Sequence, residues 1–123
     1  MPFTLKRWGE FVCWIAPKTP HCGPDDQIQR IFKYHVTCKT SDDALDSEGF
    51  VVDNLTLSAY FDNACGPANP VTISCELFAR KAALDIFALL PKSQACREVD
   101  VSIQPFEGAE IVYHYRSKED NAV

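Results

Sequence analysis

Residues 99–116 read VDVSIQPFEGAEIVYHYR, and two runs within this stretch alternate between side chains of different character. In the first run, Val99, Val101 and Ile103 alternate with polar residues, and residues 109–116 repeat the pattern with Ala, Ile and two Tyr. Side chains of a strand point alternately to its two faces, so each run predicts a strand with one face in the core. Residues 105–108 between them contain Pro and Gly, and the whole stretch therefore predicts a β-hairpin.

Two more strands are predicted towards the start of the chain. Between residues 27 and 39, one face carries apolar side chains and the other carries polar ones; the apolar set is Phe32, Tyr34, Val36 and Cys38. Residues 10–16 are apolar on both faces, which favours a strand covered on both sides. Residues 17–26 contain three prolines and predict a loop between these strands.

Two helices are predicted between the strand pairs. Asp53 or Asn54 is suited to cap a short helix that reaches Phe61, and Gly49 before it permits a tight turn. Thr72 or Ser74 is suited to cap a second helix that Pro91 ends. Helical spacing assigns that helix a buried stripe of Phe78, Ala82, Ile86 and Leu89. The order ββααββ predicts an α+β fold with an antiparallel four-stranded sheet and two helices on one face.

Composition narrows the class of protein. The 123 residues suit one domain spanning 1–123, with 117–123 as a flexible tail. The net charge is −5 and the basic residues are scattered, which argues against a nucleic-acid partner. No apolar run approaches the roughly 20 residues of a membrane span, and no export signal is recognised, so we predict a cytoplasmic protein without a membrane partner. The six cysteines are accordingly expected to be reduced and mostly buried.

Four short patterns occur in an order that resembles one known family. They are HCG at 21–23, GFVVD at 49–53, SCELFA at 74–79 and the hairpin from Val101 to Tyr113. Together they resemble the catalytic loop, the two helix starts and the last hairpin of the tunnelling-fold 6-pyruvoyl- and 6-carboxy-tetrahydropterin synthases. The resemblance implies a homo-oligomer that forms a ring-shaped barrel and binds a pterin- or purine-like small molecule between subunits.

The resemblance also implies site residues. Cys22 lies in the position of the catalytic cysteine, and a thiol there needs nearby positive charge to become reactive. The backbone N–H groups of Ser74 and Cys75, at a helix start, are suited to bind a ligand carbonyl or anion, and Glu76 follows them. Capping is the alternative role for all three residues.

The departures from the family concern the metal and the ligand anchor. Family enzymes bind zinc through three histidines, and the corresponding positions here are Pro17, Gln27 and Gln29. Proline has no donor atom, and an amide oxygen is a poor zinc ligand, so we predict no metal and no cofactor. The glutamate that anchors the pterin is replaced by Pro105, and Glu107, two residues on, is our candidate for that role; a solvated turn residue is the alternative.

Three other interpretations remain open. One is a metal-free pterin lyase or epimerase resembling dihydroneopterin aldolase, with Lys33 as the base. Another is a non-catalytic oligomeric interaction module. The third is a different metal site built from His21, His35, His114 and Cys22, although their spacing does not favour it.

Overall fold

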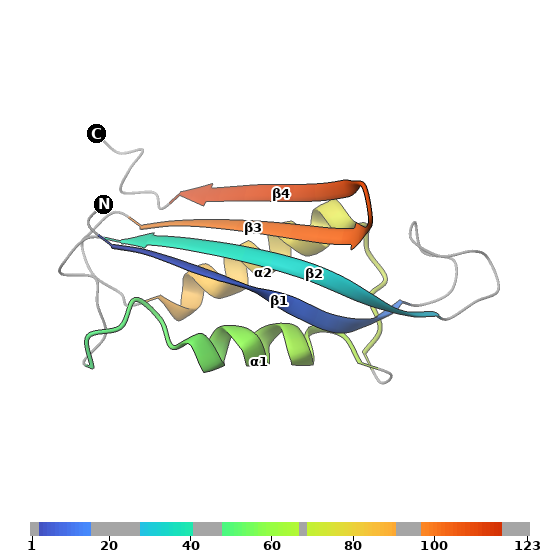
Figure 1. Ribbon diagram of the computed structural model, residues 1–123, viewed down its shortest axis with the longest axis horizontal. Coiled ribbons are helices and arrows are strands. Elements are labelled where there is room, and N and C mark those ends of the chain that lie inside the picture. Colours follow the sequence, from blue (N-terminus) through green and yellow to red (C-terminus); the bar gives the residue numbers. More distant parts are fainter. Residues whose placement is uncertain (1–2, 16–27, 41–47, 67–68, 91–96, 117–123) are drawn as a thin grey trace.

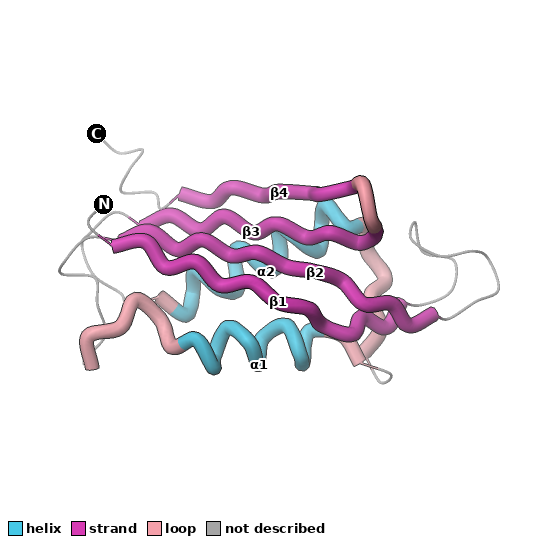
Figure 2. The backbone as a smooth tube through the Cα atoms, viewed as in Figure 1, coloured by secondary structure: helices cyan, strands magenta, loops and turns pink. Residues whose placement is uncertain are grey.

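The computed structural model describes residues 3–15, 28–40, 48–66, 69–90 and 97–116. The elements follow the predicted order; they are β1 (Phe3–Ile15), β2 (Ile28–Thr40), α1 (Asn54–Ala64), α2 (Cys75–Leu89), β3 (Arg97–Phe106) and β4 (Ala109–Arg116). The strands form one antiparallel sheet in the order β1-β2-β3-β4. Both helices lie on the same face of this sheet (Figures 1 and 2). The predicted α+β fold class is confirmed.

The core lies between the sheet and the two helices. α1 packs against β1, and α2 packs against β3 and β4. Phe11 of β1 contacts the rings of four other aromatic residues, Phe32, Tyr34, Phe61 and Phe78. Gly9 makes room for this cluster, because a Cβ atom there would lie 3.0 Å from the hydroxyl of its cross-strand partner Tyr34. Neither described helix covers the other face of the sheet, which we call the open face (Figure 2).

The first strand differs from its prediction in two ways. β1 begins at Phe3 instead of residue 10, and it pairs with β2 along its whole length, from Phe3 opposite Thr40 to Ile15 opposite Ile28. The extra residues are mostly half-exposed or exposed, so their apolar pattern is weak and pairing with β2 is what makes them a strand. The expected cover on both sides is wrong for the described part of the chain, because Val12 on the open face is 43% exposed.

The helix starts agree with the predicted caps. Oδ1 of Asp53 accepts a hydrogen bond from the backbone N–H of Leu55 at 2.8 Å, and Oγ of Ser74 accepts one from that of Leu77 at 3.2 Å. Each bond satisfies an N–H group that has no partner within its helix. Neither of the two described helices has the length and apolar character needed to cross a membrane.

The end of α2 departs from the predicted stripe. Phe78, Ala82 and Ile86 are buried as expected, but Leu89 is 43% exposed and its prediction is wrong. The next residue, Leu90, leaves the helix with extended backbone and is buried in its place. Helical spacing does not distinguish the two leucines, because positions three and four residues after Ile86 both lie on the stripe.

The loop of the C-terminal hairpin is shorter than predicted. β3 continues through Pro105 to Phe106, and only Glu107 and Gly108 form the turn, with Gly108 at φ +89°. Pro105 lies where the register between β3 and β4 shifts, between Ile103 and Phe106. Since proline has no N–H to donate, an irregular point in the ladder accommodates it without losing a hydrogen bond.

Candidate functional site

The open face contains a hollow of about 500 Å³, a size typical of small-molecule sites. It is lined by residues of all four strands: Trp8, Gly9, Glu10, Lys33, Tyr34, His35, Ser102, Gln104 and Glu110. We call it the open-face hollow. Seven of its side chains belong to strand positions that point away from the helices.

Strand register brings these residues together in two neighbouring rows. In the first row, Trp8 of β1 lies opposite His35 of β2, which lies opposite Ser102 of β3. In the second row, two residues further along, Glu10 lies opposite Lys33, which lies opposite Gln104. Residues two apart share one face of a strand, so the rows form a continuous surface.

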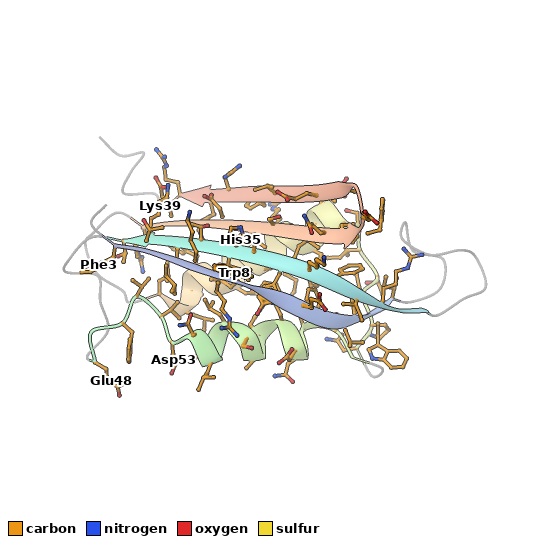
Figure 3. All side chains as sticks on the ribbon, viewed as in Figure 1. Phe3, Trp8, His35, Lys39, Glu48 and Asp53 are labelled. Atoms are coloured by element: carbon orange, nitrogen blue, oxygen red, sulfur yellow. The ribbon has the colours of Figure 1, made fainter. Side chains whose placement is uncertain are left out.

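Trp8 forms the aromatic wall of the open-face hollow. Its ring lies edge-on to His35, with centroids 5.8 Å apart and planes at 71°, and the two residues are adjacent on β1 and β2 in Figure 3. Trp8 is nevertheless 68% exposed. A large aromatic side chain that is held by a neighbour and still exposed offers a surface on which a flat ligand can stack.

The polar groups of the open-face hollow are partly engaged. Gln104 Nε2 donates a hydrogen bond to Glu110 Oε2 at 3.2 Å, which orients this carboxylate. In the part of the chain that the structure describes, Glu10 and Lys33 make no side-chain hydrogen bond and no ion pair within 4 Å. Ser102 places a hydroxyl at the floor and is only 8% exposed.

The charges of the open-face hollow favour a neutral or cationic ligand that carries N–H donors. Two carboxylates, Glu10 and Glu110, face one ammonium group, Lys33, so the acidic groups exceed the basic one. Carboxylates accept hydrogen bonds only, whereas the ammonium group donates only. Together, the two carboxylates and the ammonium group can therefore bind a molecule that presents both N–H donors and a carbonyl acceptor.

The residues predicted from the family resemblance lie elsewhere. Cys22 is outside the described residues. Glu107 is exposed in the turn between β3 and β4, beyond the end of the strand. Ser74, Cys75 and Glu76 begin α2 in the helix layer, where Ser74 is the N-cap and Cys75 is buried.

These predicted residues do not form one cluster in the described structure. No hydrogen bond or ion pair between described residues joins Glu107 to the start of α2. The hydroxyl of Ser74 is engaged in capping, and burial raises the pKa of the Cys75 thiol to about 11, with the neighbouring Glu76 adding to the effect. The capping role is thus observed for Ser74, and a ligand-binding role of the three residues stays a prediction.

The two described histidines are separate. His35 contacts Trp8, whereas His114 Nδ1 lies 2.7 Å from Asp100 Oδ1, on the far side of β3 from β2. Within the described ranges, no group of three or more His, Cys, Asp or Glu residues is placed to hold a metal ion. Pro17, Gln27 and His21 lie outside those ranges. The absence of a zinc site therefore stays a prediction from the residue types at positions 17, 27 and 29.

Among the charged residues of the open-face hollow, the sequence marks only Lys33 as a functional candidate. For Trp8 and Glu10, the sequence does contain a signal: they occupy alternate positions of β1 and therefore share one face. Trp8 lies outside the strand that is predicted to start at residue 10, whereas Glu10 is the first residue of that strand. Ser102, Gln104 and Glu110 looked like an ordinary solvent-facing set of the hairpin.

Comparison of the chain with protein-family models, with curated proteins and with solved structures finds no match in any of the three.

Proposed function

We propose that this protein binds a planar, nitrogen-rich heterocycle of the pterin or purine class in the open-face hollow. In this proposal it is a divergent, zinc-independent relative of the 6-pyruvoyl-tetrahydropterin synthase-like proteins with a degenerate active site. The main support for the proposal is that the hollow of about 500 Å³ brings together the exposed ring of Trp8 and the carboxylate of Glu10, which has no partner among the described residues.

The side chains suit the chemistry of such a ligand. A 2-amino-pyrimidinone edge presents two parallel N–H donors, which one carboxylate accepts in a charge-assisted pair. Glu10 is our candidate anchor because its carboxylate has no partner among the described residues, whereas Glu110 is bonded by Gln104. Trp8 would stack on the ring system, and Lys33 would donate to its carbonyl oxygen.

The proposal includes a cytoplasmic homo-oligomer of the tunnelling-fold type. Three apolar side chains on the open face, Val12, Ile31 and Val112, are exposed and available for burial by another subunit. β1 and β4 are the edge strands of the sheet, and an unpaired edge is a template for pairing with another chain. The described cysteines, Cys13, Cys38, Cys65 and Cys75, are free and buried, as in a reducing compartment.

A thermal-shift panel of pterin, guanine and deazapurines tests the proposed binding. A true ligand at 100 times its Kd should stabilise the protein by about 2.7 kcal/mol. Lumazine is the matched control for pterin, because it replaces the 2-amino group with a carbonyl and should give a clearly smaller shift. A flat response across the panel would contradict the proposal and leave the interaction module as the better interpretation.

One observation favours a second function, the metal-free lyase or epimerase. Lys33, the candidate base, lines the same hollow as Glu10 and lies directly opposite it in the register. An amine base beside a carboxylate anchor is the pair that such chemistry needs. We expect dihydroneopterin to be turned over, and the turnover to disappear in Lys33→Ala while the Kd changes less. Absence of turnover by the unmodified protein would reject this second function and leave the binding function untouched.

A further inference from the structure

Two buried thiols lie in contact beneath β1. Cys13 is on the helix-facing side of β1, and Cys65 is the C-cap of α1, 52 residues later in the chain. Their sulfur atoms are 3.2 Å apart, and the residues are 0% and 2% exposed. A disulfide bond is about 2.05 Å long, so the two sulfurs need to approach by only about 1.2 Å to bond.

We propose that Cys13 and Cys65 form a reversible intramolecular disulfide when the protein meets a peroxide. This modification site is independent of the proposed ligand. It would covalently tie the end of α1 to β1, the strand that carries Trp8 and Glu10 on its opposite face.

Oxidation of the two thiols by hydrogen peroxide takes two steps. The Cys65 thiolate attacks one oxygen of hydrogen peroxide, the O–O bond breaks, and with one proton the products are the Cys65 sulfenic acid and water. The Cys13 sulfur then attacks the sulfenic sulfur; the S–O bond breaks, the S–S bond forms, and the thiol proton leaves with the hydroxyl as a second water. The two thiols together lose two electrons, and the peroxide gains them.

The environments of Cys13 and Cys65 indicate which of the two thiols reacts first with the peroxide. The hydrogen bond between the two thiols lowers the pKa of Cys65, with a backbone hydrogen bond from Trp14 acting in the same direction against burial. The same hydrogen bond, together with burial, raises the pKa of Cys13. Cys65 also ends α1, whereas Cys13 lies within β1, so we assign Cys65 as the thiol that attacks and Cys13 as the thiol that resolves the sulfenic acid.

The two other described thiols are poorer targets. Burial raises the pKa of Cys38 to about 12, and the pKa of Cys75 is also raised, so both stay protonated at neutral pH. Cys65 has a second advantage in its position at the end of a helix, where local opening admits a small oxidant more readily than in the centre of a sheet.

Peptide mapping of the oxidised full chain tests the proposal without any variant. The folded protein is treated with one equivalent of hydrogen peroxide, alkylated and digested with trypsin. We expect the intact protein to lose about 2 Da before alkylation, and the digest to contain a cross-link between the peptide 8–18, which contains Cys13, and the peptide 40–80. Dithiothreitol should reverse both changes. The disulfide should also raise the Tm by on the order of 10 °C.

A variant is needed to locate the second sulfur, because peptide 40–80 contains both Cys65 and Cys75. The cross-link should persist in Cys75→Ala and in the control Cys38→Ala, and it should disappear in Cys65→Ala. Alkylation of both Cys13 and Cys65 after peroxide treatment would overturn the proposal. So would a cross-link that is lost in Cys75→Ala, or accumulation of an irreversible sulfinic acid at Cys65.

Discussion

Phe61→Ala is expected to lower the free energy of unfolding by about 3–5 kcal/mol, which is a large part of the stability of a small domain. Phe61 is completely buried, and its ring stacks on Tyr34 with centroids 4.0 Å apart and planes at 21°. It also contacts Phe11, with centroids 5.3 Å apart. Removing the ring leaves a cavity between α1 and the sheet. Urea denaturation followed by circular dichroism measures the loss.

Leu55→Ala is the matched control for this substitution. Leu55 is in the same helix but is 76% exposed, so its truncation should change the free energy of unfolding by no more than about 0.5 kcal/mol. Equal losses for the two variants would mean that α1 does not present Phe61 to the sheet as described.

Trp8→Ala is expected to raise the Kd for the pterin- or purine-like ligand by about 5- to 150-fold, since stacking on an aromatic side chain contributes about 1–3 kcal/mol. Glu10→Gln should weaken binding by a similar amount, because a charge-assisted hydrogen bond contributes about 1.5–3 kcal/mol. Both side chains are exposed on the open face, so neither change should alter the unfolding midpoint by much. Isothermal titration calorimetry with the best ligand of the thermal-shift panel measures both effects.

Two carboxylates outside the open-face hollow provide controls of the same chemistry. Glu107→Gln changes the turn between β3 and β4, and Glu76→Gln changes the first turn of α2. Both variants should bind as the unmodified protein does. If Glu107→Gln abolishes binding and Glu10→Gln does not, the ligand occupies the site suggested by the family resemblance instead of the open-face hollow.

Much of the fold was predictable because it depends on patterns of neighbouring residues, such as strand alternation and helix caps. The alternation from Val99 to Arg116 identified the hairpin, and the caps Asp53 and Ser74 identified the helix starts. The first seven residues of β1 were missed because pairing with β2, rather than a strong local pattern, holds them in the sheet. Leu89 was assigned to the core because residues 89 and 90 both fit the helical spacing after Ile86, and the structure buries Leu90 instead.

The candidate site was less predictable than the fold. A polar residue on the open face of a strand, such as Gln104, has the same sequence signature whether it faces solvent or a ligand. Lys33 was recognised only through its family analogy. The Cys13–Cys65 contact had no sequence signature at all, because 52 residues separate the two thiols.

By itself, the sequence determined the type and order of the elements, because strand alternation and helix capping depend on neighbouring residues. Only the tertiary structure determined which side chains meet. The register of four strands places Trp8, Glu10 and Lys33 around one hollow, and the packing of α1 on β1 brings Cys65 to Cys13. Such contacts depend on the pairing of distant segments, and a shift of one residue in that pairing would turn these side chains to the opposite face.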